Sequence, residues 1–445
     1  MASPETIAIV GAGYTGALLA VQLLRRTPAR VLLIERRSVF GLGLAYGTGC
    51  PAHLLNVRSG RMSAFPDDAS HFVRWLQDNR PELADPDGFA PRMVYGEYVR
   101  ATLDAQEAAS PGRFERVSGE VTAIDADGQG VQLKLADGRR LSADRCVLAL
   151  GNAPPDPAGA AGLTPGASDR FINDPWAPGA LATVKPADEV LLIGSGLTMI
   201  DVALALDAQG WLGRALALSR RGLLPRPHDA TQSHAQPWPP VDASLSQRAK
   251  AFRARARTIG WGEAMDEIRP FNQALWRAAD SSERRRFLRH LRPWWDVHRH
   301  RTATEIGARI QAMIEARTLS VGAGRVVKAE TRPAGVWIDW RPRGATETRH
   351  DRFDRVINCT GPLSDLNRSP DPLHRDLLDR GVARIDRERL GLDVDAGLRV
   401  IDGEGRAHRR LYAVGPITRG EAWEIIAVPE IRGQVAELAE RFARG

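Results

Sequence analysis

The feature that most constrains this chain is a glycine-rich turn close to its N-terminus. Residues 6–10 (TIAIV) are apolar and β-branched, which predicts a buried strand, and Gly11-Ala12-Gly13-Tyr14-Thr15-Gly16 follows directly. A helix is predicted to continue to Arg26, and a second apolar run, 31–34, ends at Glu35. A strand, a Gly-x-Gly-x-x-Gly turn, a helix, a strand and an acid in this order predict a dinucleotide-binding unit.

The residues of this unit have separate physical roles. Gly11 permits the tight turn, Gly13 lets main chain approach a pyrophosphate, and Gly16 lets the helix pack on the strand. The helix N-terminus offers unpaired N–H groups to the phosphates. Glu35 stands about 20 residues beyond the last glycine, where a carboxylate accepts hydrogen bonds from a ribose diol.

Residues 7–24 are largely apolar, so a membrane helix or a signal peptide is the alternative there. Three glycines, Gln22 and the lack of a basic flank argue against both, and no other stretch is long and apolar enough to span a membrane. The three cysteines, Cys50, Cys146 and Cys359, are far apart and form no Cys-x-x-Cys. They exclude a disulfide scaffold and a dithiol reductase, and they indicate a reducing, cytoplasmic compartment.

The net charge of +7 comes from 61 Lys and Arg against 54 Asp and Glu. Only four of the basic residues are lysines, and the arginines are mixed with acids along most of the sequence. This pattern predicts a solvated surface and anionic small ligands. It argues against nucleic acid as a partner.

A second unit of the same kind begins near the middle of the chain. Residues 189–193 predict a strand, Gly194-Ser195-Gly196-Leu197-Thr198-Met199 the turn, and 200–208 the helix. Met199 replaces the third glycine, and Asp201 in the first helical turn suits the helix dipole. We therefore expect a second nucleotide site at this turn.

The end of the next predicted strand, 215–219, indicates which nucleotide binds there. An acid at this place selects the ribose hydroxyl of NAD, whereas arginine accommodates the 2′-phosphate of NADP. The sequence has Arg220 and Arg221, which predicts NADPH. The alternative is that both arginines only face solvent.

Other segments repeat between the two units. A β-meander is predicted over 114–141, before a buried strand that ends at Gly151, and again over 321–355, before one that ends at Gly361. A last buried strand ends at Gly415-Pro416, and 422–441 is predicted as helix, interrupted near Pro429.

Together these elements predict an α/β protein with two Rossmann-like domains, the NADP domain inserted into the FAD domain. The predicted boundaries are an FAD domain over 1–155 and 356–445 and an NADP domain over 180–355, with a linker at 153–179 and a helical insertion at about 228–317. Chain crossings at Gly151 and Gly361 are the expected hinges.

The insertion is basic and rich in tryptophan, most densely between Arg292 and Arg301. His298 and His300 lack a third ligand at a usual spacing, so no metal site is predicted. Two interpretations stay open, a structural collar and a wall of a substrate pocket for an anionic group.

These motifs, with Gly43 to Gly47, the stretch His53 to Asp68 and Val414 to Arg432, resemble bacterial FAD/NAD(P)-binding proteins related to flavin-containing and N-hydroxylating monooxygenases. The resemblance implies that Asn56 hydrogen-bonds flavin or nicotinamide and acts in catalysis. Many such flavoproteins have Gly-Asp where this chain has Gly415-Pro416, so the ribityl contact must come from elsewhere. The residues implied to bind cofactors are Gly11, Gly13, Tyr14, Thr15, Gly16, Glu35, Arg36, Gly43, Tyr46, Asn56, Met62, Gly151, Gly194, Gly196, Leu197, Thr198, Arg220, Arg221, Thr360, Gly361, Gly415, Pro416 and Trp423.

The function implied is an FAD-dependent, NADPH-consuming monooxygenase. Hydride passes from NADPH to flavin, and a flavin C4a-(hydro)peroxide then transfers oxygen from O2 to a small nucleophile such as an amine or amino acid. The alternatives are an NADPH-dependent flavin oxidoreductase without oxygen insertion and a non-catalytic nucleotide-binding sensor. No membrane or nucleic-acid partner is expected, and the oligomeric state stays open.

Overall fold

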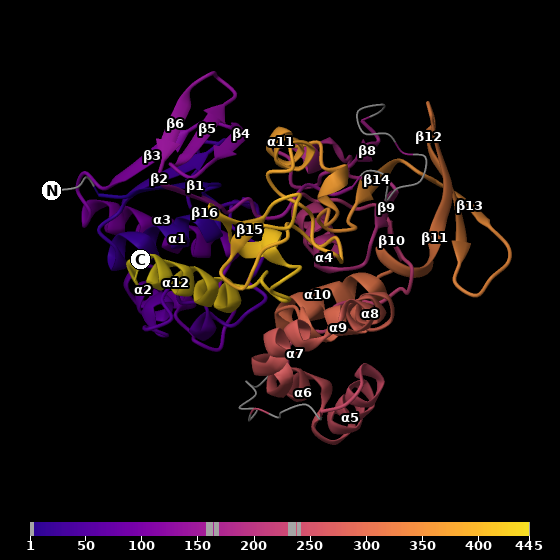
Figure 1. Ribbon diagram of the computed structural model, residues 1–445. Coiled ribbons are helices and arrows are strands. Elements are labelled where there is room, and N and C mark those ends of the chain that lie inside the picture. The colour runs from indigo at the N-terminus through magenta and orange to yellow at the C-terminus, as the bar shows by residue number, and fades with distance from the viewer. Residues whose placement is uncertain (1–3, 157–162, 164–168, 230–236, 238–241, 445) are drawn as a thin grey trace.

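The computed structural model describes residues 4–156, 163, 169–229, 237 and 242–444. Two sheets form separate lobes, both chain ends lie in the same lobe, and helices α5 to α7 gather at the bottom of the view (Figure 1). Parts of the predicted linker, 157–162 and 164–168, and of the predicted insertion, 230–236 and 238–241, lie outside the described residues. The predicted α/β fold class is confirmed.

The first sheet is built from both ends of the chain. Its order is β15-β16-β7-β1-β2-β3, and all its neighbours are parallel except β15 and β16. Strand β16 lies beside β7, with Leu411 opposite Cys146, so the second lobe is inserted into the first. The strands are β1 (Thr6–Val10), β2 (Arg30–Glu35), β3 (Phe114–Ser118), β7 (Arg145–Leu148), β15 (Arg399–Ile401) and β16 (Ala407–Ala413).

Helix α1 (Tyr14–Arg26) is the central helix of this lobe. Every residue from Tyr14 to Leu24 is buried, because α3 and α12 both pack against it. Buried apolar side chains on several sides of one helix are typical of such an internal position. The other helices of this lobe are α2 (His71–Asn79), α3 (Arg92–Ala108), α11 (Pro372–Asp379) and α12 (Val428–Arg444).

The second lobe has a seven-stranded sheet of order β13-β12-β11-β10-β9-β14-β8. Strands β8 to β11 and β14 are parallel neighbours, and β12 and β13 extend the sheet antiparallel at one edge. The strands are β8 (Phe171–Ile172), β9 (Val190–Ile193), β10 (Ala215–Ser219), β11 (Leu319–Arg332), β12 (Gly335–Pro342), β13 (Arg349–Phe353) and β14 (Arg355–Asn358), and the helices are α4 (Leu197–Ala208) and α10 (Thr304–Glu315).

Both predicted meanders are only partly correct. Strand β3 pairs parallel with β2 in the main sheet, and only β4 (Val121–Ala126), β5 (Val131–Leu135) and β6 (Arg140–Ala143) form an antiparallel meander. The reason is that α3 precedes β3, and a strand that returns after a crossover helix pairs parallel. In the second lobe, β11 pairs parallel with β10 over 319–323 and antiparallel with β12 from Gly324 onward.

The last predicted helix also differs from the structure. Helix α12 begins at Val428, and Pro429 lies in its first turn instead of interrupting it. The first-turn N–H groups of a helix have no intrahelical partner, so proline there removes no hydrogen bond.

The insertion consists of short helices that dock on the C-terminal segment. These are α5 (Leu245–Ile259), α6 (Trp261–Ile268), α7 (Asn272–Ala278), α8 (Ser281–Arg286) and α9 (Arg292–Arg299). A small apolar cluster joins Trp276 of α7 to Leu390 and Trp423. The Trp276 indole N–H also donates to the Gly420 carbonyl at 2.8 Å.

The chain crosses between lobes at two glycines with left-handed backbone, Gly151 (φ +69°) and Gly361 (φ +86°). The strands β7 and β14 end just before them, and Ala153 and Leu363 form an antiparallel bridge that ties the two crossings together. This places the two expected hinges side by side.

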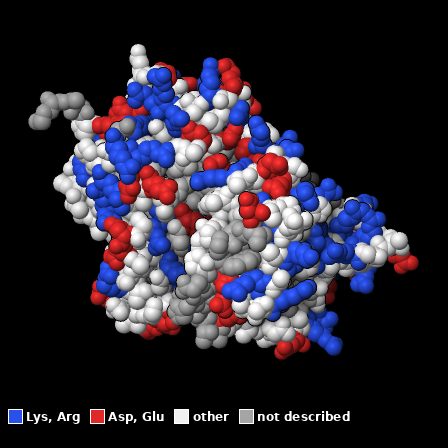
Figure 2. Space-filling view, turned by 60° about the horizontal axis from the view of Figure 1, so that its bottom comes forward, with Lys and Arg blue, Asp and Glu red and all other residues white. Residues whose placement is uncertain are grey.

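Figure 2 shows Arg and Lys side chains interspersed with Asp and Glu over the face that it presents. Many of these groups pair, as Arg74 does with Asp68 and Arg380 with Asp376. No helix of the described residues is long and apolar enough to cross a membrane.

Candidate functional site

The first glycine turn is fixed by close backbone packing. Gly11 has φ +98°, and a Cβ there would lie 2.5 Å from the Ala149 carbonyl oxygen on the adjoining strand connection. A Cβ on Gly16 would lie only 1.8 Å from the Gly11 carbonyl oxygen. Because neither position has room for a side chain, both glycines are required by the fold of the turn itself.

A cavity of about 740 Å³ opens beside this turn. The N-terminus of α1 faces it, and Gly13, the residue before the helix, has no side-chain cap, so first-turn N–H groups stay available to an anion. The predicted site residues that line the cavity are Gly11, Gly13, Tyr14, Thr15, Glu35, Arg36, Gly43, Tyr46, Gly151 and Pro416.

The loop around Gly43 folds against the turn. A Cβ built on Gly13 would lie 3.4 Å from the Gly43 Cα, and one on Gly43 would lie 3.2 Å from the Gly13 Cα. The two main chains therefore meet with no side chain between them. Such bare backbone is what the close approach of a pyrophosphate requires.

Glu35 is held at the edge of the cavity by main-chain donors. Its Oε2 accepts from the Ala12 N–H at 2.8 Å, and its Oε1 accepts from the Arg37 N–H at 3.0 Å. Arg36 also lines the cavity, but its guanidinium is paired with Asp371 at 2.8 Å. The fixed carboxylate and the uncapped helix end fit a dinucleotide, with the ribose at Glu35 and the diphosphate at α1.

The C-terminal strand brings a further part of the cavity wall. Gly415 has φ +76°, and a Cβ there would lie 2.8 Å from the Thr15 side chain. Its N–H donates to Gln434 Oε1 at 2.7 Å, which ties it to α12. The segment after β16 thus packs on the start of α1, and Pro416 reaches the cavity next to it.

Gly16 and Gly415 pack behind the cavity without lining it, and Met62, Asn56 and Trp423 lie in other parts of the structure. Met62 is buried in the core, and its carbonyl accepts from the Tyr95 hydroxyl at 2.9 Å. Asn56 lines a separate cavity of about 40 Å³, and its carbonyl accepts from His228 Nε2 at 3.0 Å. Trp423 is buried and lines a larger pocket between the helices of the insertion.

The second glycine turn has the same backbone requirement at its first glycine. Gly194 has φ +119°, and a Cβ there would lie 2.3 Å from the Cys359 carbonyl oxygen, whereas Gly196 is exposed with open space around it. Ser195 Oγ donates to the Leu223 carbonyl at 2.6 Å and holds the turn. None of the predicted NADP residues lines the first cavity: Gly194, Gly196, Leu197, Thr198, Arg220, Arg221, Thr360 and Gly361.

The arginines after β10 carry charge available to a ligand. Arg220 is exposed, and within the described part of the chain neither it nor Arg221 has a carboxylate partner. The Arg221 guanidinium lies over the Trp294 ring, 6.0 Å from its centre. Thr360 is exposed next to Gly361, and its hydroxyl donates to Asn358 Oδ1 at 2.7 Å.

An ion pair that the sequence analysis missed connects helix α3 of the first lobe to helix α4 of the second. Arg92 of α3 donates to both carboxylate oxygens of Asp201 of α4, at 2.7 and 3.0 Å. Because α4 begins at Leu197 and not at residue 200, Asp201 lies beyond the first helical turn in which it was predicted. His53 Nε2 donates to the Asp201 carbonyl at 2.8 Å. Burial lowers the pKa of His53, so the ring is neutral, with Nδ1 accepting from the Thr48 hydroxyl. Arg92 and Asp201 are 109 residues apart, and no local pattern marks such a pair.

The two histidines of the insertion, His298 and His300, contact different side chains. The His298 ring stacks on Trp261, with ring centres 4.3 Å apart, and His300 lies 3.7 Å from the buried Glu424 carboxylate. Within the described residues, no group of three His, Cys, Asp or Glu side chains could hold a metal ion.

Comparisons with known proteins agree with this geometry. Residues 8–153 match a family model described as FAD-NAD(P)-binding. No curated protein sequence matches the chain. Among solved structures, the ornithine hydroxylase of Pseudomonas aeruginosa in its reduced form has 17% identity and a TM-score of 0.65, over 98% of this chain and 100% of its own.

Two further structures align over nearly the whole chain. The FAD-bound cadaverine monooxygenase of desferrioxamine biosynthesis from Erwinia amylovora has 11% identity and a TM-score of 0.68, over 99% of this chain and 95% of its own. The thioredoxin reductase of Lactococcus lactis has 14% identity and a TM-score of 0.54, over 99% of both chains. Residues 8–153 therefore resemble an FAD-NAD(P)-binding domain, and the chain as a whole shares its fold with these three enzymes.

Proposed function

We propose that the protein is an FAD-dependent, NADPH-consuming monooxygenase that transfers oxygen to a small nucleophilic substrate, such as an amine or amino acid. The observation that carries the proposal is the pair of glycine turns on two sheets. One turn lies beside a cavity of about 740 Å³ with Glu35 fixed at its edge, and the other precedes two arginines without acid partners among the described residues. The fold likeness to ornithine and cadaverine hydroxylases supports it.

FAD, when bound, supplies hydride acceptance and oxygen activation, and the protein supplies position and environment. Gly13 and the first turn of α1 bind the FAD diphosphate, and Glu35 binds its ribose. Arg220 and Arg221 bind the 2′-phosphate of NADPH. The Arg92–Asp201 pair holds the starts of α3 and α4 together, so that the two nucleotides enter from defined directions.

Asn56 is proposed to act at the reacting end of the cofactors. Its main chain is fixed by His228, and no side-chain hydrogen bond of Asn56 forms within the described residues. Five arginines line the small cavity beside it, namely Arg58, Arg61, Arg269, Arg299 and Arg301. Asp229 and Asp266 line the same cavity, and Arg269, Arg299 and Arg301 are paired with carboxylates.

A flavin oxidoreductase without oxygen insertion is the second candidate, because the thioredoxin reductase likeness favours it. The cysteines argue against thiol reduction. Cys146 and Cys359 are buried, and burial raises the pKa of both thiols, while Cys50 stands apart from them as a free cysteine. Without an internal dithiol to relay electrons, O2 is the favoured acceptor.

The test follows the flavin spectrum of the purified full-length protein. We expect bound FAD that NADPH bleaches without oxygen, which a non-catalytic sensor does not do. On mixing the reduced protein with O2, a monooxygenase regains the oxidised spectrum only after a delay, through a distinct absorbing species. Immediate single-step re-oxidation would favour the oxidoreductase instead. Asn56→Ala should shorten the delay, whereas the exposed Asn79→Ala should not.

A further inference from the structure

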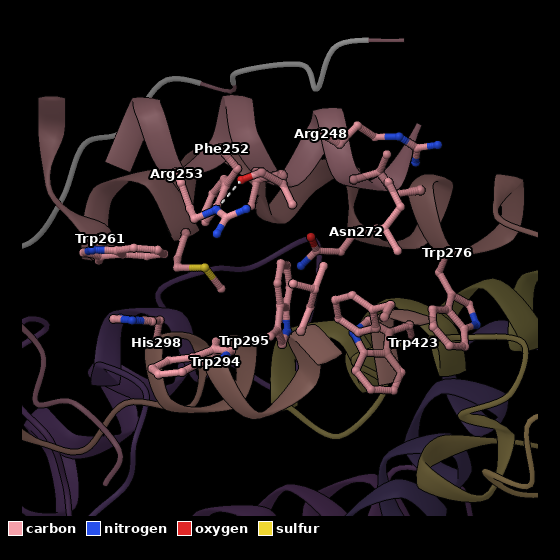
Figure 3. A pocket seen from close by; sticks show the side chains of 18 of the residues that line it. Arg248, Phe252, Arg253, Trp261, Asn272, Trp276, Trp294, Trp295, His298 and Trp423 are labelled. Carbon is pink, nitrogen blue, oxygen red and sulfur yellow. Dashed lines mark hydrogen bonds between the residues drawn. The ribbon is translucent and has the colours of Figure 1, made fainter. Parts of the chain in front are cut away.

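The helices of the insertion enclose a pocket of about 800 Å³ (Figure 3). It lies between α5, α6, α7 and α9, with Trp423 of the C-terminal segment at one end. No residue lines both this pocket and the cavity beside the first glycine turn. The insertion pocket is therefore a second space, as large as the one that fits FAD.

Aromatic side chains form both ends of the insertion pocket. At one end Trp261 stacks on His298, with Phe252 edge-on to Trp261 at 5.9 Å. At the other end Trp276 and Trp423 stack with ring centres 4.8 Å apart. Flat aromatic rings at both ends of a pocket are typical of a site for a planar molecule with apolar faces.

A polar group without a partner points into the space between these ends. Asn272, at the start of α7, is 5% exposed, and neither its Nδ2 nor its Oδ1 has a hydrogen-bond partner among the described residues. Figure 3 shows its amide directed into the pocket between the two aromatic ends. Buried amides are normally hydrogen-bonded, so a ligand that offers a hydroxyl or amide here satisfies a group the protein leaves open.

Two arginines of the pocket lining, Arg253 and Arg226, lack an acid partner within the described residues. Arg253 of α5 donates from Nε to the Ala249 carbonyl at 3.1 Å, and its terminal nitrogens point into the pocket (Figure 3). The other lining arginines, Arg248, Arg284 and Arg301, instead face Glu283, Glu388 and Asp266 at 3.6, 3.7 and 2.7 Å. The charge of Arg253 thus favours an anionic group on the ligand.

The insertion pocket also lies against the parts proposed to hold the cofactors. The backbone around Trp423, which follows Gly415 and Pro416, accepts hydrogen bonds from Gln273 and Trp276 of α7. On another side, Arg221 covers the ring of Trp294, which lines the pocket. The pocket is therefore lined by Trp423 of the C-terminal segment and by Trp294, whose ring carries the arginine that follows β10.

We propose that the insertion pocket binds a small planar aromatic carboxylate, with its rings between the tryptophans, its acid group at Arg253 and a second polar group at Asn272. That this molecule is the substrate class rests on the proposed function, whereas binding itself does not. The proposal differs from the aliphatic amines that the ornithine and cadaverine hydroxylases are named for.

The test is calorimetric titration of the full-length, FAD-loaded protein with 6-hydroxy-2-naphthoate and with 2-naphthoate, which lacks the hydroxyl. We expect one site, and tighter binding of the hydroxylated probe by about fivefold, near the middle of what a hydrogen bond to a neutral group contributes. Asn272→Leu should remove this preference. Arg253 is exposed on α5, so Arg253→Met should fold, and it should weaken the binding of both probes about tenfold.

A variant that fills the insertion pocket, compared with a control variant, shows whether the probes bind in this pocket. Ala249→Trp, which places an indole inside the pocket, should abolish binding, and Ala254→Trp, on the exposed side of the same helix, should not. Circular dichroism and the melting temperature check that each variant folds. Binding unaffected by Ala249→Trp, no binding by the unaltered protein, or tighter binding of L-ornithine in this pocket would each overturn the proposal.

These outcomes are separable from failure of the proposed function, because the titration needs neither NADPH nor O2. Binding without any oxygen transfer would refute only the monooxygenase. NADPH-driven oxygen transfer to an amine, with no aromatic acid bound, would refute only the assignment of this pocket.

Discussion

Arg92 and Asp201 form an ion pair with two hydrogen bonds, which joins α3 of the first lobe to α4 of the second. Their side chains are only 15% and 8% exposed. The Arg92 Nε also donates to the Leu54 carbonyl at 3.0 Å, so the guanidinium is satisfied on two sides. A charge pair placed this deep fixes how the lobes face one another.

We predict that Arg92→Met lowers the free energy of unfolding by about 3–5 kcal/mol, because it leaves the buried Asp201 carboxylate without its counter-charge. Urea denaturation of the full-length protein measures this. The control is Arg74→Met, which removes the exposed pair with Asp68 and should cost less than about 1 kcal/mol. Equal losses in the two variants would contradict the structural role of the buried pair.

A substitution at Gly13 separates cofactor binding from folding. Gly13 has φ −66°, which any residue adopts, and an added Cβ meets only Gly43 at 3.4 Å. Gly13→Ala should therefore fold, yet bind FAD at least about tenfold more weakly, because its methyl group stands between main chain and pyrophosphate. Flavin absorbance per chain and titration of the stripped protein measure the loss.

Gly16→Ala is the contrasting variant, since its Cβ would lie 1.8 Å from the Gly11 carbonyl oxygen and should prevent folding of the turn. A fully flavin-loaded Gly13→Ala protein would show that the diphosphate binds elsewhere.

Replacing Arg220 and Arg221 together with alanine tests the choice of nucleotide. Loss of two charged donors should raise the KM for NADPH about 10- to 100-fold and leave that for NADH nearly unchanged. Arg214→Ala is the control, because Arg214 is exposed at the opposite end of β10. Unaltered discrimination between the two nucleotides would mean that both arginines only face solvent.

Acid should destabilise the protein through His228. Burial, with Arg301 nearby, lowers the pKa of His228 to about 4, while the unfolded chain keeps the ordinary value near 6.5. Between these two values the unfolded state binds the extra proton, so the free energy of unfolding falls as pH falls, by up to about 3 kcal/mol from this group.

His228→Gln should therefore make stability less steep in pH between about 4 and 6.5. Denaturation midpoints across that range provide the measurement, with the exposed His290→Gln as control. A steeper profile in His228→Gln would contradict the assigned direction of the shift.

The order of local elements could be predicted from the sequence, because each glycine turn and each apolar strand has its cause within a few residues. Gly16, for example, is dictated by the Gly11 carbonyl of the same turn, whereas the close contact at Gly11 is with the Ala149 carbonyl, far away in sequence. The partner of a strand is different. Nothing within β3 distinguishes a parallel edge of the main sheet from the first strand of a meander, and the preceding crossover helix decides it.

The candidate site was likewise predictable only where its residues lie close together in the sequence. Residues next to the first turn line one cavity, whereas Trp423, distant in sequence from the insertion, lines the insertion pocket. Two features depend on how the lobes and helices pack, namely the pairing of Arg92 with Asp201 and the unpartnered amide of Asn272. The spacing of apolar residues in the sequence does not predict either of them.

The first sheet also dictates an order of events during synthesis. Strand β16 pairs with β7, and α12 covers α1, so the N-terminal lobe lacks an inner strand and a covering helix until residues 407–444 have left the ribosome. Until then the apolar side of α1 that α12 covers stays exposed to solvent, and chaperones bind exposed apolar surface of this kind. Because Pro416 completes the cavity beside Gly13, a coenzyme can load only after translation is almost finished, and late truncations should yield insoluble, colourless protein.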